Sequence, residues 1–156
     1  MEIVNNESKK KEKVVAVILT HNRKKLLLEG LKGIFNQTYL LEKIIILDSN
    51  STDGTYEILK EEGIIDRLNV EYVKLKQNKG PSGGFAKGIN LAMKENPDWV
   101  WVLDDDISPK EDCLESLMEY RNISSCIAPY RQGKTVPFFN PAIGITSHSK
   151  NLSFNN

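Results

Sequence analysis

The stretch that decides the fold is "VVAVILT" at residues 14–20, because its apolar, largely β-branched residues follow one another without alternation. A strand with one face in water alternates apolar and polar residues, whereas a strand covered on both faces reads as one apolar run. "KIIILD" (43–48) is a second run of this kind, and "WVWVL" (99–103) predicts a further apolar strand. The sequence therefore predicts buried strands in a mostly parallel sheet.

Helical spacing separates these strands. The apolar residues that predict the inward faces of two helices are Leu27, Leu31, Ile34 and Phe35 in the first, and Phe85, Ile89, Ala92 and Met93 in the second. Residues 70–76 alternate and predict a third strand near an edge, and residues 124–129 predict a fifth strand. Strands that alternate with helices indicate an α/β fold, a three-layer sandwich.

Two further helices have terminal signals. Residues 49–63 predict a turn and a short helix, capped by Ser51, Thr52 or Asp53 and ended by Gly63. "SPKE" (108–111) reads as a capping box, and its helix would turn three residues inward: Leu114, Leu117 and Met118. We therefore expect a polar tail over 1–13, one domain over 14–129 and an irregular stretch over 130–156.

The composition excludes several classes of protein. Lys+Arg and Asp+Glu number 21 each, so no overall field attracts nucleic acid or anionic lipid. Cys113 and Cys126 lack metal-binding spacing, and we expect buried, reduced thiols in a cytoplasmic protein. No apolar run approaches the roughly 20 residues of a membrane span. A weak contact of Lys9, Lys10 and Lys11 with the inner face of a membrane stays open.

Polar segments follow each of the first four predicted strands, and ligands of parallel sheets bind at that carboxyl edge. These segments are "THNR" (20–23), "DSNSTDGT" (48–55), "NKGPSGG" (78–84) and "DDD" (104–106). Their convergence predicts a binding site at this edge.

Each segment also has a structural interpretation. Residues 48–55 form a good turn and helix cap, and residues 78–84 are either a flexible loop or glycines that let the backbone approach a phosphate. Arg23 and Lys87 are either phosphate ligands or surface charges. His21 is better explained as a polar loop residue than as a metal ligand, since no second histidine lies nearby.

Three consecutive carboxylates repel one another by about 1 kcal/mol per pair even in water. A divalent cation with oxygen ligands offsets such repulsion. At the end of an apolar strand, beside the other polar segments, residues 104–106 therefore predict a metal site.

In this order the motifs resemble the family 2 glycosyltransferases, inverting nucleotide-sugar enzymes of the GT-A fold. The motifs that resemble the family are "VVAVILTHNR" (14–23), "IIILDSNSTDGT" (44–55), "NKGPSGGFAKGINLA" (78–92) and "WVWVLDDDISP" (99–109). The resemblance covers about residues 14–129 and is greatest to the galactofuranosyl- and rhamnosyltransferase-like branch.

The resemblance implies a role for each matching residue. Asp48 would bind the base, Asp53 would fix the loop beneath it, and Asp105 would face the donor sugar. Asp104 and Asp106 form the DxD motif, which would hold Mn²⁺ or Mg²⁺. The implied donor-binding residues are Thr20, His21, Asn22, Arg23, Asp48, Asn50, Asp53, Asn78, Gly83, Gly84, Lys87, Asp104 and Asp105.

The resemblance also implies partners: a UDP- or dTDP-sugar as donor and a glycan or lipid-linked acceptor. The general base of the family lies downstream of DxD, but residues 130–156 contain no Asp or Glu. We therefore expect the base outside this chain and a chain that stops within a larger domain, whose open edge a homodimer would cover.

Two other functions stay open: a nucleotide-sugar-binding module without transfer activity, and a nucleotidyltransferase of related fold. The nucleotidyltransferase is disfavoured because "THNRKKLL" (20–27) has no glycine for a phosphate loop.

Overall fold

The computed structural model describes residues 11–129 and 145–146. The chain divides into two compact units, and the first comprises residues 1–32 and 40–108. The second comprises residues 33–39 and 109–156. Residues 14–129, expected as one domain, thus contribute to both units. Most of the predicted terminal stretches, 1–13 and 130–156, lies outside the described residues.

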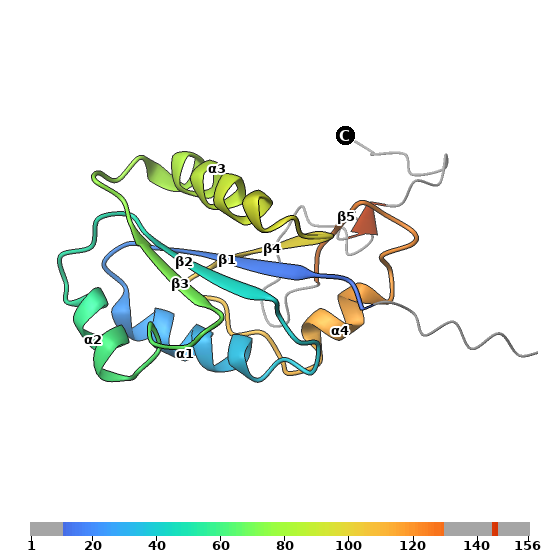
Figure 1. Ribbon diagram of the computed structural model, residues 1–156, viewed down its shortest axis with the longest axis horizontal. Coiled ribbons are helices and arrows are strands. Elements are labelled where there is room, and N and C mark those ends of the chain that lie inside the picture. Colours follow the sequence, from blue (N-terminus) through green and yellow to red (C-terminus); the bar gives the residue numbers. More distant parts are fainter. Residues whose placement is uncertain (1–10, 130–144, 147–156) are drawn as a thin grey trace, which may run out of the picture. The chain divides into compact units, whose positions relative to one another are not determined.

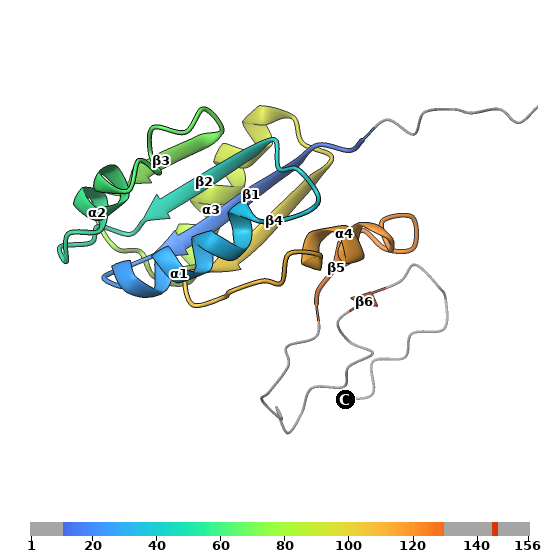
Figure 2. The same cartoon turned by 90° about the horizontal axis from the view of Figure 1, so that it is seen from below.

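The first unit contains a four-stranded sheet in the order β3-β2-β1-β4 with every neighbouring pair parallel (Figure 2). Its strands are β1 (Val14–Thr20), β2 (Lys43–Asp48), β3 (Val70–Lys74) and β4 (Trp99–Asp104). All of β1, and β2 from Ile44 onward, is buried, which confirms the interpretation of the unbroken apolar runs. The alternating segment forms β3 at an edge, as predicted.

Helices cover both faces of this sheet, which gives three layers (Figure 1). Helix α3 (Gly80–Ala92), extended by a 3₁₀ turn at Met93–Glu95, lies on one face. Helices α1 (Lys24–Phe35) and α2 (Thr55–Glu61) lie on the other.

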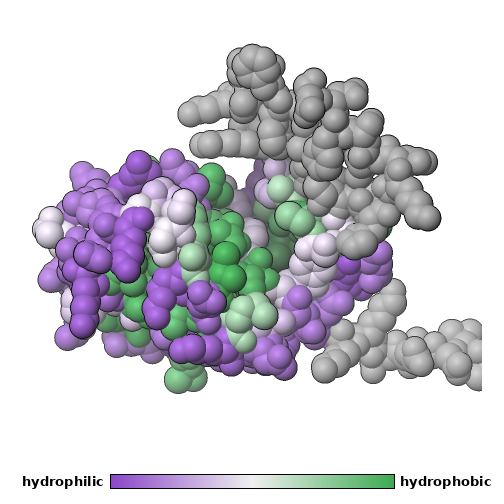
Figure 3. All heavy atoms as spheres, turned by 90° about the horizontal axis from the view of Figure 1, so that it is seen from above, coloured by the Kyte–Doolittle hydropathy of each residue, from purple (hydrophilic) through white to green (hydrophobic). Residues whose placement is uncertain are grey.

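The face that α3 turns to the sheet differs from the prediction. Ile89 and Met93, expected inside, are 37% and 57% exposed, whereas Gly84 and Gly88 are buried. A Cβ on Gly84 would lie 2.5 Å from Cδ1 of Leu19, so a larger residue there would displace the Leu19 side chain. Figure 3, which views this face, shows hydrophobic residues exposed near its middle and hydrophilic residues towards one end.

The short helix α2 begins later than predicted. Its cap is Gly54, with a left-handed φ of 84°, instead of Ser51, Thr52 or Asp53. Glycine adopts this conformation without the steric cost that other residues incur. The predicted end is correct: Gly63 N–H donates to the carbonyl of Lys60 and Ile64 N–H to that of Leu59, which is a Schellman motif.

The second unit contains α4 (Cys113–Met118) and an antiparallel pair, β5 (Cys126–Ile127) and β6 (Ile145–Thr146). The predicted fifth strand therefore exists only as two residues outside the main sheet.

The prediction of a capping box at residues 108–111 is wrong, because Ser108, Pro109 and Glu111 precede the helix and Asp112 is the N-cap. Gln37 takes over the capping. Its amide oxygen accepts the N–H of Leu114 at 2.8 Å, and its amide nitrogen donates to the carbonyl of Lys110 at 2.6 Å. A local sequence motif cannot reveal a cap that comes from so far along the chain.

The amino end of the sheet is held by polar contacts. Lys43 Nζ lies 2.7 Å from both Glu71 Oε2 and Glu95 Oε1. Lys13 N–H donates to Asp98, and Trp99 Nε1 donates to Glu12. These two contacts hold Glu12 and Lys13 against the start of β4.

Neither cysteine forms a disulfide, but the expectation that both thiols are buried is wrong. Cys113 is half-buried at the start of α4, and Cys126 is exposed in the two-residue strand β5. Among the described residues, no helix combines the length and apolar character that crossing a membrane requires.

Candidate functional site

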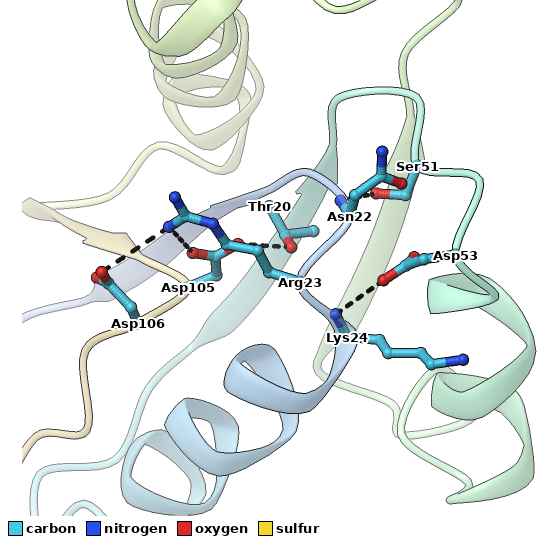
Figure 4. Close-up of polar contacts among 8 residues, drawn as sticks. All are labelled: Thr20, Asn22, Arg23, Lys24, Ser51, Asp53, Asp105 and Asp106. Carbon is cyan, nitrogen blue, oxygen red and sulfur yellow. Dashed lines mark hydrogen bonds and ion pairs between the residues drawn. The ribbon is translucent and has the colours of Figure 1, made fainter.

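The segments after β1 and β2 are hydrogen bonded to each other at the carboxyl edge of the sheet (Figure 4). Asn22 N–H donates to Ser51 Oγ at 2.9 Å, and Thr52 N–H donates to Asn22 Oδ1 at 2.7 Å. Asn22 and Asn50 both adopt left-handed φ values, 54° and 64°, which asparagine tolerates better than most residues. His21, Asn22 and Asn50 remain exposed beside this junction.

Asp53 fixes the start of two helices. Its Oδ2 accepts the N–H of Lys24, the first residue of α1, and its Oδ1 accepts the N–H and hydroxyl of Thr55, the first residue of α2. Burial acts to raise the pKa of Asp53, but the hydrogen bonds from Thr55 and Lys24 outweigh it and lower that pKa. Asp53 therefore ties the starts of α1 and α2 to the loop between β2 and α2.

Asp48, predicted to bind the base, is 0% exposed. Its Oδ1 accepts the N–H of Ser51 at 2.7 Å, and its Oδ2 accepts a short hydrogen bond from the hydroxyl of Tyr72. Burial and this hydrogen bond raise the pKa of Tyr72, so the phenol stays a donor at neutral pH. Because Asp48 is fully buried, a ligand can reach its carboxylate only after a neighbouring group, such as that hydroxyl, moves.

The three consecutive aspartates lie in different environments. Asp105 is buried, and its Oδ2 accepts the hydroxyl of Thr20 at 2.8 Å. Its Oδ1 lies 3.2 Å from Nη1 of Arg23 (Figure 4). Asp104 and Asp106 are exposed, and Asp106 Oδ2 lies 3.8 Å from the same nitrogen. Asp105, predicted to face the donor sugar, is thus turned towards β1.

The carboxylates at this edge fit a hard divalent metal ion. Within the described residues, no group of three or more His, Cys, Asp or Glu side chains is arranged to hold a metal. Asp104 and Asp106 therefore provide at most two carboxylates. Mg²⁺ and similar hard cations are commonly bound by one or two carboxylates together with substrate phosphates. The site thus fits a divalent ion that arrives with a diphosphate.

The segment after β3 is the start of a helix instead of a loop. Asn78 Oδ1 accepts the N–H of Gly80, and α3 begins there. Gly83 and Gly84 lie in its first turns, where Gly84 packs on Leu19. Lys87 is exposed, about 10 Å farther along the helix axis than Gly80.

Sequence reasoning missed two contributors to this edge. Tyr72 pairs with Ile46 in the β2–β3 register, and this register places Tyr72 on the face of the sheet that carries Asp48. Gly30 of α1 lies against the backbone of Asp105 and Ile107. The alternation of residues 70–76 indicates that Tyr72 lies on one face of a strand. The sequence does not show how β3 aligns with β2, so the contact of Tyr72 with Asp48 could not be predicted.

Comparison with known proteins connects this arrangement to one family. The profile described as "Glycosyl transferase family 2" matches residues 15–134. The galactofuranosyltransferase GlfT1 of Mycolicibacterium smegmatis is 29% identical over 107 residues, which cover 69% of this chain and 34% of that protein. The chain thus spans about a third of the length of this relative.

Solved structures support the same fold. The mannosyltransferase PcManGT from Pyrobaculum calidifontis, in complex with GDP-Man and Mn²⁺, matches with a TM-score of 0.64 and 23% identity over 79% of this chain and 37% of that one. S. aureus TarS 1-349, in complex with UDP-GlcNAc, matches with a TM-score of 0.61 and 23% identity over 80% and 37%. The layers and the parallel sheet are those of the GT-A fold, and the chain belongs to glycosyl transferase family 2.

Proposed function

We propose that this chain is the donor-binding part of an inverting, metal-assisted glycosyltransferase. Its donor is a nucleotide-diphosphate sugar, UDP- or dTDP-linked, and its acceptor is a glycan or a lipid-linked glycan. The observation that carries the proposal is the pair of exposed carboxylates, Asp104 and Asp106, at the carboxyl edge beside the Arg23 guanidinium. The Mn²⁺ and nucleotide sugars bound by the two structural neighbours support it.

Asp104 and Asp106 would hold Mn²⁺ or Mg²⁺. When bound, the ion acts as a Lewis acid that stabilises the departing nucleoside diphosphate. Arg23 presents a positive charge at the same edge, and the exposed side chains of His21, Asn22 and Asn50 border the nucleotide. Asp105 and Thr20 contribute to the donor site indirectly. Asp105 holds Arg23 in place, and the Thr20 hydroxyl holds Asp105.

The base and the diphosphate would bind at two further parts of this edge, Asp48 and the start of α3. Asp48 would accept an N–H of the base after the Tyr72 hydroxyl moves away from it. Asn78, Gly83 and Gly84 would border the diphosphate and the sugar at the start of α3, with Lys87 farther along the helix. Asp53 supports the base-binding loop without touching the ligand.

A second candidate function is nucleotide-sugar binding without transfer. It is favoured because the carboxylates described at this edge already have partners or a metal role. Asp48 and Asp53 are hydrogen bonded within the chain, and Asp105 is paired with Thr20 and Arg23. None of these three is available to deprotonate an acceptor, so transfer requires a base supplied elsewhere. Two thiols that form no disulfide fit a cytoplasmic location.

Calorimetric titration of UDP in the presence of Mn²⁺, and again in EDTA, tests the donor site. The wild-type chain should bind UDP only with the metal, and Asp106→Asn should lose at least about tenfold in affinity, since one charged metal ligand is removed. Asp66→Asn, the same change at an exposed loop residue, is the matched control and should bind normally.

Equal affinity for UDP with and without Mn²⁺ would contradict the metal role. Product mass analysis with the chain and candidate acceptors separates the two functions, because only a transferase forms the glycosylated acceptor.

A further inference from the structure

Arg23 lies between two carboxylates that differ in burial (Figure 4). Its Nη1 is 3.2 Å from Asp105, whose side chain is 5% exposed, and 3.8 Å from Asp106, whose side chain is 41% exposed. Both contacts use Nη1, whereas a guanidinium carries five N–H donors on three nitrogens. Arg23 itself is 54% exposed and so remains accessible to a ligand.

Of the two ion pairs of Arg23, the one with Asp105 is the more stable. A buried carboxylate that loses its partner leaves an uncompensated charge, which is strongly destabilising. Asp105 is further fixed by the Thr20 hydroxyl at the end of β1. The longer contact with exposed Asp106 is screened by water and contributes little, so it exchanges easily.

We infer that Arg23 is a positioning residue that competes with the metal ion for Asp106 and makes metal binding depend on the nucleotide. The inference rests on the proposed function. Without nucleotide, Arg23 offsets part of the negative charge that would attract a divalent ion. A diphosphate brings negative oxygens that satisfy the ion and the guanidinium together, so Asp106 can pass from Arg23 to the ion while Asp105 keeps Arg23 at the edge.

Charge arithmetic gives the size of the effect. A unit positive charge within a few ångströms of a divalent ion changes the affinity for that ion about tenfold, even with the screening of water. Removal of the Arg23 charge should therefore strengthen binding of the metal alone. The same removal should weaken binding of the nucleotide, because charge-assisted hydrogen bonds to phosphate oxygens are lost. A residue with a merely structural role would not shift these two affinities in opposite directions.

The test measures binding of Mn²⁺ by the electron paramagnetic resonance signal of the free ion, with and without UDP. For the wild-type chain we expect weak binding of Mn²⁺ alone and much tighter binding with UDP. In Arg23→Met, the affinity for Mn²⁺ alone should rise about tenfold and the gain caused by UDP should shrink. Arg23→Lys keeps the charge and should stay close to wild type for Mn²⁺ alone.

The matched control is Lys25→Met, which removes the same charge from an exposed position two residues along α1 and should behave as wild type. Circular dichroism verifies that each variant is folded, and Arg23→Lys carries the test if Arg23→Met fails to fold. The inference about Arg23 is overturned if UDP tightens Mn²⁺ binding in the wild type but Arg23→Met binds Mn²⁺ alone no more tightly than the wild type does. In the Lys variant, binding of Mn²⁺ alone that is several-fold tighter than wild type overturns it too. No gain from UDP in the wild type overturns the proposed function, and this inference with it.

Discussion

Asp48 and Tyr72 show how one residue limits what another can bind. Asp48 is fully buried, and each of its two oxygens accepts a hydrogen bond, one from the Ser51 N–H and one from the Tyr72 hydroxyl. The ring of Tyr72 packs against Tyr56 with centroids 5.3 Å apart. In the proposed donor site, a nucleotide base that replaces the Tyr72 hydroxyl at Asp48 exchanges one hydrogen bond for another.

Tyr72→Phe should lower the free energy of unfolding by about 1–3 kcal/mol, because Asp48 Oδ2 loses its donor inside the protein. The same change should leave UDP affinity equal or higher, since the base N–H no longer competes with a hydroxyl. Urea unfolding and calorimetry measure the two effects. Tyr56→Phe, at the exposed ring of the pair, should change stability by less than about 0.5 kcal/mol. A Tyr72→Phe protein that binds UDP more weakly would contradict the exchange at Asp48.

The pH dependence of this variant has a definite sign. Burial and the hydrogen bond to Asp48 raise the pKa of Tyr72 above its ordinary value of 10.0. The unfolded chain therefore loses this proton first, and the stabilisation is complete below about pH 10 and lost as the pH rises further. Between about pH 9 and pH 11, the wild type should lose more stability than Tyr72→Phe. Parallel curves would show that the phenol is not held by Asp48.

At this scale the sequence predicted which residues gather and not how they pair. The positions of Asp48, Asp53 and the 104–106 triplet at strand ends followed from the apolar runs that precede them. The inward turn of Asp105 did not, because it depends on Thr20 and Arg23, which lie more than 80 residues earlier in the chain. Side-chain partners across such separations become visible only with the register of the strands.

At the scale of elements, α1 determines the path of the chain after β4. A Cβ on Gly30 would lie 2.7 Å from the carbonyl oxygen of Ile107, and one on Gly33 would lie 2.6 Å from that of Pro109. Each glycine costs a helix interior about 1 kcal/mol relative to alanine. The close approach of the 105–109 segment explains why the chain accepts that cost.

Gly30→Ala should therefore destabilise the chain by about 1–3 kcal/mol, although the same change in an open helix is stabilising. The displaced segment carries Asp105 and Asp106, so metal-dependent UDP binding should weaken as well. Thermal unfolding and calorimetry measure both. Glu29→Ala, at the exposed neighbouring position of α1, is the control and should change little. A more stable Gly30→Ala protein would show that the segment does not lie on the helix.

Elements were predictable where local pattern decided them. The four strands of the main sheet and the end of α2 at Gly63 followed from hydrophobic runs and turn chemistry. The inward face of α3 and the start of α4 did not, because close packing on Leu19 and the remote cap from Gln37 override local preference. Tertiary contacts of this kind leave no periodic signal in one sequence.

At the scale of the whole molecule, the two ends of the parallel strands, called here the amino edge and the carboxyl edge of the sheet, differ in function. The amino edge carries the ion pairs of Lys43 with Glu71 and Glu95, and the carboxyl edge carries the proposed donor site. Lys43 and Asp48 lie at opposite ends of β2, about 16 Å apart along the strand. Changes at the two edges should then act independently, since sites this far apart usually add.

Lys43→Met should test that independence together with Asp106→Asn. Hydrogen bonds to Glu71 and then Glu95 raise the pKa of Lys43 above its ordinary 10.5, so its stabilisation is complete at neutral pH and lost only as the pH rises beyond that value. At pH 7, Lys43→Met should cost about 1 kcal/mol of unfolding free energy, and less in high salt, because two glutamates lose a shared cation that is 24% exposed. UDP affinity with Mn²⁺ should not change. Asp106→Asn should show the reverse, and the double variant should combine both losses. A nucleotide affinity that falls in Lys43→Met would mean that the amino edge positions the donor site, and that the sheet transmits strain from one edge to the other.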